Sequence, residues 1–199
     1  MRLRSALEET AAVGHSLVRG ALAPARTEEL LDELAPCGFA PLEPVIGTVR
    51  QRGEGLTLDL DDDACPLTAE LVSELTGEVR TSGIPGTADY APDEITCQRY
   101  LDERSGIGPH MDQRRYRLLV AAFTLVGEAP FTVFEDRSAT TVVRAWTTGR
   151  GDLCLLRAPG LAGQPDGRPT HSVGGPARGA RVSLTVRASR SALDPARQG

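Results

Sequence analysis

A change of sequence pattern near residue 95 is the feature that most restricts the fold of this chain. From there to residue 188 the chain consists of short β-type runs that are separated by Gly and Pro. Apolar runs of this length between turn residues are typical of β-strands. The runs cover residues 95–101, 117–126, 131–135, 140–146, 152–157 and 180–188. Strands at this spacing predict a β-rich second half, built as a sandwich or jelly roll.

The first third of the chain has helical patterns instead. Apolar residues recur at helical spacing over residues 3–18, which predicts a first helix. Thr27, followed by two glutamates, predicts the N-cap of a second helix, and Gly38 predicts its end. Two short runs, 45–49 and 56–60, predict additional strands ahead of the β-rich half.

A third helix is expected from Pro66 to about Gly77, because Pro is well suited to the first turn of a helix. Asp61, Asp62 and Asp63 stand directly before it. Three adjacent carboxylates could bind a metal ion. Their position at a helix start favours capping, since negative charge is stabilised at the N-terminal end of a helix.

The length of 199 residues fits one globular domain. We expect a single domain over residues 1–190, with mainly helical support in 1–80, a β-core in 95–188 and a flexible tail in 191–199. The expected fold class is therefore α+β, mainly β. A chain of this size buries enough surface to fold without a disulfide or a structural metal, so a bound metal would serve chemistry.

The basic residues exclude several functions. All 22 of them are arginine, and the chain has neither Lys nor Asn. Without a primary amine it cannot form a Schiff base with pyridoxal phosphate, and it lacks the lysine of P-loops and of kinases. Without Asn it has no N-glycosylation acceptor. The net charge of −5 argues against a broad face that binds a phosphate backbone.

The cysteines and the hydropathy pattern predict a cytoplasmic protein. The four cysteines have no C-x-x-C spacing, which is typical of reduced, buried thiols. They are Cys37, Cys65, Cys97 and Cys154. We expect no signal peptide, because Glu8 and Glu9 interrupt the N-terminal region before any apolar run of sufficient length. We also expect no membrane span.

Three histidines can be weighed one by one. His15 falls in the first expected helix, where a structural role is expected. His110 precedes Asp112 by two positions, and in an extended segment such residues point to the same side. The pair alone is also compatible with a turn or a surface pairing. His171 lies at the far end of the β-rich region, where a rolled-up sheet can bring it back. Two histidines and one carboxylate are the ligands of non-haem Fe(II) oxygenases.

The last expected strand has one polar and one apolar face. Polar residues alternate there with Val182, Leu184 and Val186. The polar residues are Arg181, Ser183, Thr185 and Arg187. On an exposed strand they would face solvent. If they face the interior instead, the guanidinium groups need anionic partners, which a dicarboxylate would supply.

Taken together, these motifs resemble the Fe(II)- and 2-oxoglutarate-dependent dioxygenase superfamily, and most closely its AlkB-like branch. The matching segments are Cys97-Gln98-Arg99-Tyr100, His110-Met111-Asp112, His171-Ser172-Val173 and the stretch from Arg181 to Arg187. The resemblance implies a double-stranded β-helix, a jelly-roll core with supporting N-terminal helices. It also implies an enzyme that uses Fe(II), 2-oxoglutarate and O2 and releases succinate and CO2.

The resemblance assigns roles to individual residues. Fe(II) would be held by His110, Asp112 and His171, which are also the catalytic residues. Arg181 would pair with the far carboxylate of 2-oxoglutarate, and Arg187 would bind it near its metal-chelating end. The remaining cosubstrate contacts are expected from Tyr100, Gln98 and Ser183. Gln98 stands where AlkB-like proteins usually have Asn.

The substrate implied is a small molecule or a peptide-like molecule, oxidised by hydroxylation, desaturation or dealkylation. An AlkB-type demethylase of alkylated DNA or RNA bases is disfavoured, because the chain is poor in aromatic residues and residues 53–63 are acidic. A non-catalytic jelly-roll binding module is a second alternative. Arg114, Arg115 and Arg117 could bind an anionic substrate group or merely solvate a strand edge. Trp146 could line the pocket or belong to the core.

Overall fold

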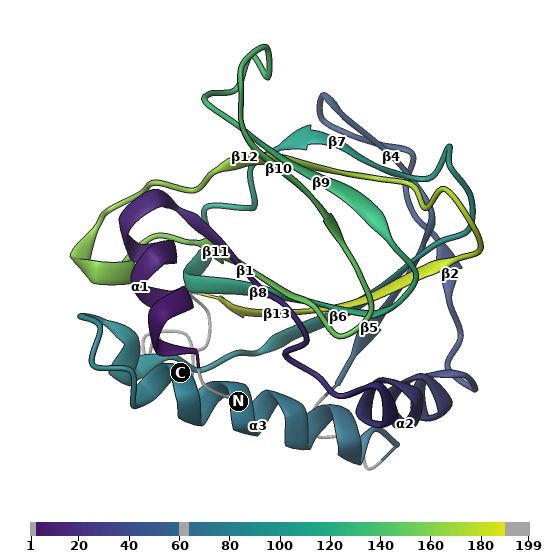
Figure 1. Cartoon of the computed structure of the whole chain (residues 1–199), viewed down its shortest axis with the longest axis horizontal. Helices are drawn as coiled ribbons and strands as arrows, with labels where there is room; N and C mark the ends of the chain where they lie inside the picture. The colour runs from purple at the N-terminus through teal and green to yellow at the C-terminus, as the bar shows by residue number, and fades with distance from the viewer. Residues whose placement is uncertain (1–2, 60–63, 190–199) are drawn as a thin grey trace, which may run out of the picture.

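The computed structural model describes residues 3–59 and 64–189. Two antiparallel β-sheets face each other, and helices cover the outer face of one of them (Figure 1). The helices are α1 (Arg4–Val13), α2 (Pro24–Leu34) and α3 (Pro66–Arg80), with two short 3-10 turns, Thr87–Asp89 and Leu161–Gly163. In the described ranges none of them has the length and apolarity needed to cross a bilayer.

The larger sheet, called here the major sheet, has seven strands in the order β1-β11-β8-β13-β6-β5-β2. Their bounds are β1 His15–Val18, β11 Leu153–Arg157, β8 Tyr116–Val126, β13 Arg181–Ser189, β6 Glu94–Tyr100, β5 Glu54–Leu58 and β2 Ala40–Pro41. The last strand of the chain, β13, is central and pairs with β6 on one side and β8 on the other.

The smaller sheet, called the minor sheet, has six strands in the order β10-β9-β12-β7-β4-β3. Their bounds are β10 Val142–Thr148, β9 Ala129–Phe134, β12 Thr170–Gly174, β7 Gly106–His110, β4 Val49–Arg52 and β3 Val45–Ile46. The expected fold class is confirmed: the protein is α+β, mainly β, with a jelly-roll core and N-terminal helices that support it.

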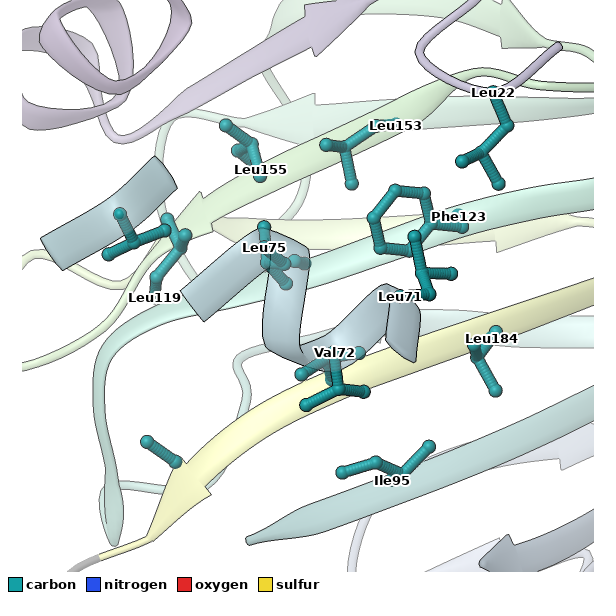
Figure 2. Close-up of a cluster of buried hydrophobic side chains, with 14 of the residues drawn as sticks. Leu22, Leu71, Val72, Leu75, Ile95, Leu119, Phe123, Leu153, Leu155 and Leu184 are labelled. Atoms are coloured by element: carbon teal, nitrogen blue, oxygen red, sulfur yellow. The ribbon is translucent and has the colours of Figure 1, made fainter. Parts of the chain in front are cut away.

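The main hydrophobic core lies between the major sheet and the helices. Leu184 from β13, Ile95 from β6 and Phe123 from β8 are fully buried there against Leu71 and Leu75 of α3 (Figure 2). Burial of each such side chain contributes about 1.5–3 kcal/mol to folding. Because side chains alternate along a strand, the residues between these core positions must point toward the minor sheet.

The first helix is shorter than the sequence predicts. It ends at Val13, because Gly14 takes a left-handed conformation with φ 93° and its N–H bonds to the carbonyl of Thr10. His15 then begins strand β1, so the prediction of a helical His15 was wrong. An apolar pattern alone does not reveal where a glycine stops the helix.

The second helix starts before Thr27, and the prediction of Thr27 as its N-cap was also wrong. Pro24 occupies the first turn, where its fixed φ and missing N–H fit a helix start. Thr27 is buried inside the helix, and its hydroxyl donates to the carbonyl of Pro24 at 2.7 Å. The helix ends at Leu34, ahead of the predicted stop at Gly38.

The third helix begins at Pro66 as predicted and continues past Gly77 to Arg80. Its first turn is capped from another helix: the carboxylate of Glu33 accepts the main-chain N–H groups of Leu67 and Thr68 at 2.6 and 2.9 Å. These two hydrogen bonds satisfy main-chain N–H groups that a helix start leaves without partners, and they join α2 to α3. The aspartates at 61–63 and the expected tail at 191–199 lie outside the described residues.

Strands β6, β8, β9, β10, β11 and β13 match the predicted runs within a few residues at each end. Strands β7 and β12 were not predicted. Both contain glycine, and β7 also contains Pro109, residues that strands normally disfavour. These two strands carry His110 and His171.

Candidate active site

Strand pairing in the minor sheet brings two distant histidines together. β12 runs antiparallel to β7 with His171 opposite His110. Their ring centroids are 4.3 Å apart, with an angle of 50° between the ring planes. The ring of His171 is almost completely buried, whereas His110 is half-buried.

Both imidazole rings are oriented by main-chain carbonyl groups. The Nδ1 atom of His110 lies 2.9 Å from the carbonyl oxygen of Gly108, and that of His171 lies 3.1 Å from the carbonyl oxygen of Pro169. A carbonyl oxygen can only accept, so each Nδ1 carries the proton and donates it. Each Nε2 therefore keeps its lone pair, which is the state that a metal ion requires.

Asp112 completes this group from the segment directly after β7. Its Oδ2 atom lies 3.7 Å from Nε2 of His171. The backbone of Asp112 is held by Arg168, whose Nη1 donates to its carbonyl oxygen at 2.5 Å. Arg168 is itself fixed by an ion pair with Asp166. This chain of bonds ties the segment that carries the carboxylate to the loop before β12.

The side chains of His110, Asp112 and His171 are neighbours, but they are farther apart than the ligands of a bound metal ion. In the described part of the chain, no three His, Cys, Asp or Glu side chains are already arranged to hold an ion. Two adjacent ligands of an octahedral ion with bonds of about 2.1 Å lie about 3 Å apart. The pair of Asp112 and His171 at 3.7 Å therefore needs a movement of roughly 1 Å or less to reach that spacing.

The electrostatics of the site favour the protonation states that a metal ion needs. Burial tends to raise the pKa of Asp112, but its electrostatic interactions with the ring of His171 and with the guanidinium groups of Arg187 and Arg168 outweigh burial and lower this pKa overall. Burial also lowers the pKa of His171 to about 4, although the charge of Asp112 opposes this shift. At neutral pH the carboxylate is therefore charged and the imidazole is neutral.

The lowered pKa of His171 predicts a loss of stability in acid. In the unfolded chain this histidine takes up a proton near its ordinary pKa of 6.5, but in the folded protein only near 4. Stability therefore falls as the pH falls between these values, by about 2 kcal/mol from about pH 7 to about pH 5. We expect thermal unfolding in the presence of a chelator to show this decrease.

The variant His171→Gln is the control for this prediction, because it removes the titrating ring and keeps a polar side chain of similar size. Its melting temperature should fall less between the same two pH values than that of the parent protein. An equal decrease in both proteins would show that other groups cause the acid sensitivity.

A polar stripe on the major sheet faces the two histidines. Arg181 of β13 lies opposite Tyr100 of β6 in the pairing register, and Ser183 lies opposite Gln98. These positions alternate with core residues such as Leu184, so their side chains point toward the minor sheet. The polar face of the last strand is thus turned to the interior, which was one of the two alternatives left open by the sequence.

Arg181 is a buried cation without an acidic partner. Arg181 is 3% exposed, and within residues 3–59 and 64–189 its guanidinium donates only to the hydroxyls of Ser183, at 2.9 Å, and Thr124, at 3.3 Å. Its Nε atom has no partner, and no carboxylate of the described residues forms an ion pair with it. The buried hydroxyl of Tyr100 also lacks a partner in the part of the chain that the structure describes. Buried polar groups are normally paired, so this end of the site fits an anion.

Arg187 lies between two carboxylates at the other end of the stripe. Its Nη1 donates to the hydroxyl of Thr96 at 2.7 Å and lies 3.6 Å from Oε1 of Glu94. Its Nε lies 3.7 Å from Oδ1 of Asp112 and has no hydrogen-bond partner. The guanidinium therefore connects the proposed metal ligands to Glu94.

Two cavities meet at these residues. The inner cavity, of about 70 Å³, is lined by Arg181, Ser183 and other polar side chains on one part and by apolar side chains on the rest. These are Ile107, Val120, Ala122, Phe131, Leu156 and Val173. The outer cavity, of about 480 Å³, lies on the side of β2 to β5. The two share Gln98, Ile107, His110, Asp112 and Arg187. The histidine and carboxylate groups therefore lie where a cosubstrate on one side could meet a substrate on the other.

An aromatic stack supports His171 from behind. The ring of Phe131 is parallel to that of His171, with 5.4 Å between centroids, and Trp146 is parallel to Phe131 at the same distance. Trp146 lines neither cavity, so its place is in the smaller hydrophobic cluster behind the site. Phe131 was missed by the sequence analysis, because one apolar residue in a strand does not differ in pattern from any core residue.

The arginines that follow Asp112 lie outside both cavities. Arg115 pairs with Glu94 and donates to the side-chain oxygen of Gln113. Arg114 is exposed, and neither of these arginines lines either cavity. Arg117 points toward Gly160. The structure thus does not bring Arg114 and Arg115 into the pocket as the sequence-based hypothesis required.

Comparison with known proteins identifies the fold. No protein-family model and no curated protein matches the chain. A prolyl-4-hydroxylase from Pseudomonas putida superposes with a TM-score of 0.65 at 17% identity, covering 94% of this chain and 99% of its own. A prolyl hydroxylase from Trichoplax adhaerens, in complex with a peptide fragment of the oxygen degradation domain of hypoxia inducible factor, gives 0.65 at 12% identity, with 96% and 90% covered.

A third similar structure is the non-heme alpha ketoglutarate dependent carbocyclase SnoK from nogalamycin biosynthesis. It gives a TM-score of 0.65 at 12% identity, with 92% of this chain and 82% of its own covered. At such low identities these likenesses show a shared fold. The chain therefore has, over nearly its whole length, the jelly-roll fold of these oxygenases.

Proposed function

We propose that the protein is an Fe(II)- and 2-oxoglutarate-dependent dioxygenase that oxidises a small-molecule or peptide-like substrate. The reaction would be a hydroxylation, desaturation or dealkylation. The observation that carries this proposal is the buried guanidinium of Arg181, which has no acidic partner and faces the cavity that His110 and His171 also line. The shared fold supports it, since a site with a free cation and free imidazole lone pairs fits both a dicarboxylate and a metal ion.

The residues present fit the iron ion and the cosubstrate. His110 and His171 would bind Fe(II) through their Nε2 atoms, and Asp112 through its carboxylate. Arg181 would bind the far carboxylate of 2-oxoglutarate in a two-pronged, charge-assisted pair. When bound, iron together with 2-oxoglutarate and O2 supplies the oxidising power that attacks a C–H bond and releases succinate and CO2.

The other residues would position the cosubstrate and keep water out. Tyr100 and Ser183 lie on the same face of the major sheet as Arg181, and their hydroxyls would contact the same anion. The apolar side chains on one part of the inner cavity, including Phe131 and Leu156, would exclude water from that side of the cosubstrate. Gln98 lines both cavities and offers a neutral donor and acceptor between them.

Two alternatives rank lower. Demethylation of alkylated nucleic-acid bases, the activity that the AlkB-like resemblance suggests, needs a basic groove, and the outer cavity offers only Arg187, which already faces two carboxylates. A non-catalytic binding module would leave the burial of Arg181 unexplained. A cytoplasmic location is expected, since none of the four described cysteines forms a disulfide.

The test is calorimetric titration of the complete protein with Fe(II) and 2-oxoglutarate under argon. We expect one iron and one 2-oxoglutarate per chain, with much weaker binding of 2-oxoglutarate when iron is absent. Admission of air should then produce succinate. A protein that binds neither iron nor 2-oxoglutarate in stoichiometric amounts would be a binding module and not an oxygenase.

A further inference from the structure

The outer cavity has an apolar wall next to the proposed iron site. The wall is formed by the strands of residues 40–58 together with β7 and the segment after it. Its apolar side chains are Leu42, Ile46, Val49, Leu56, Ile107 and Met111. The volume of about 480 Å³ lies in the range of sites that enclose one drug-sized molecule.

The charges around this cavity leave no cation for an anionic ligand. Arg187 is the only arginine in its lining, and it faces the carboxylates of Glu94 and Asp112. Other arginines lie next to lining residues in sequence but are not part of the lining. Arg50 and Arg114 are exposed to solvent, and Arg115 is paired with Glu94. The remaining acidic residue in the lining is Glu43, at the exposed rim. A negatively charged group placed here would lose its hydration without gaining a free positive partner.

The polar side chains of the lining are mostly engaged as well. Gln51 donates to the carbonyl oxygen of Glu43 at 2.8 Å, and Gln113 accepts from Arg115 at 2.8 Å. In the described part of the structure, the side-chain amide of Gln98 forms no hydrogen bond. It lies at the boundary with the inner cavity. The free polar contact that the outer cavity shares with the inner cavity is therefore a neutral amide.

The hairpin of β3 and β4 exposes apolar side chains at the mouth of this cavity. Ile46 lines the cavity and is nevertheless 55% exposed, and the neighbouring Val45 is 48% exposed. A molecule in the cavity would cover Ile46 and remove apolar surface from water, at about 25 cal/mol per Å². The exposed isoleucine thus belongs to the binding surface.

We infer that the substrate of the proposed oxygenase is a mainly apolar, uncharged molecule, which the outer cavity holds through its aliphatic wall and the amide of Gln98. This inference rests on the proposed function for the chemistry, while the binding preference can be measured without turnover. It excludes substrates whose recognition depends on a carboxylate, a phosphate or a nucleic-acid backbone.

The test uses two fluorescent probes that share one aromatic skeleton and differ in charge. N-phenyl-1-naphthylamine is neutral, and 1-anilinonaphthalene-8-sulfonate carries a sulfonate group. We expect the folded protein with iron and 2-oxoglutarate under argon to bind one neutral probe per chain, at least about tenfold more tightly than the anionic probe. Ile46→Glu should weaken binding of the neutral probe by about tenfold or more, because the substitution places a charge on the apolar wall.

The matched control is Val142→Glu, because Val142 is a valine of β10 with 54% exposure that does not line the outer cavity. It should leave binding of the neutral probe unchanged. Equal binding of both probes, or an Ile46→Glu protein that binds the neutral probe normally, would overturn the inference and leave the proposed function intact. If 2-oxoglutarate fails to bind while the neutral probe binds as expected, the result contradicts the proposed function but supports an apolar binding site in the outer cavity.

Discussion

The variant His110→Ala should lose iron-dependent conversion of 2-oxoglutarate to succinate by more than about 100-fold. Removing a residue that hydrogen-bonds to a metal ligand lowers metal affinity or activity by about 10- to 100-fold, and removing the ligand itself lowers them further. His110 is half-buried at the end of β7, so the substitution leaves the main core intact. The measurement is succinate formation together with iron bound per chain after gel filtration.

His15→Ala is the matched control, because His15 is the one histidine that lies outside both cavities of the site. Its ring packs against Trp146 with 5.6 Å between centroids. This variant should retain iron and 2-oxoglutarate turnover, and any effect should be confined to stability. A His110→Ala protein that still binds one iron and turns over 2-oxoglutarate would refute the proposed ligand set.

The second large effect is expected at Arg181, where function and stability should change in opposite directions. Arg181→Met should weaken 2-oxoglutarate binding by a factor of about 30 to several thousand, the loss of about 2–5 kcal/mol typical of a broken buried charge pair. The same variant should be at least as stable as the parent in the absence of ligands. The reason is that burial lowers the pKa of Arg181 and no carboxylate compensates the buried charge, whereas methionine fills similar space without one.

The measurements are calorimetric titration with 2-oxoglutarate in the presence of Fe(II) under argon, and thermal unfolding of the ligand-free protein. Arg181→Lys serves as the control, because it keeps the charge but not the two-pronged geometry, and it should bind with intermediate affinity. Unchanged affinity in Arg181→Met would mean that the cosubstrate is anchored elsewhere. A large loss of stability without ligand would mean that the arginine is structural.

The sequence predicted the β-rich half well because its strands obey local rules. Runs bounded by glycine and proline marked six of the observed strands, and alternation in the last of them separated the core face from the polar face. The pattern failed where tertiary contacts override local preference. Strand β7 was not predicted because it contains Gly106 and Pro109, which strands normally disfavour. Helix α1 was predicted too long because the apolar spacing continues past Gly14.

The candidate site was predicted in part because its donors lie in recognisable motifs. His110, Asp112 and Arg181 could be selected from spacing and resemblance, and the register of β7 and β12 explains why His171 joins them. The support of His171 by Phe131 and the wall around Ile46 could not be predicted in this way. Both depend on strand pairing and on exposure, which no local pattern encodes.

The donors of the proposed metal site come from the minor sheet and the segment after β7, whereas Arg181 stands on the major sheet. A keto diacid bound at both ends would therefore connect the two sheets for as long as it is bound. Binding would then increase the free energy of unfolding, and this increase would grow with the logarithm of the ligand concentration. Because succinate is one carbon shorter than 2-oxoglutarate, it would span the distance between the two sheets less well, which would favour its release after each catalytic cycle.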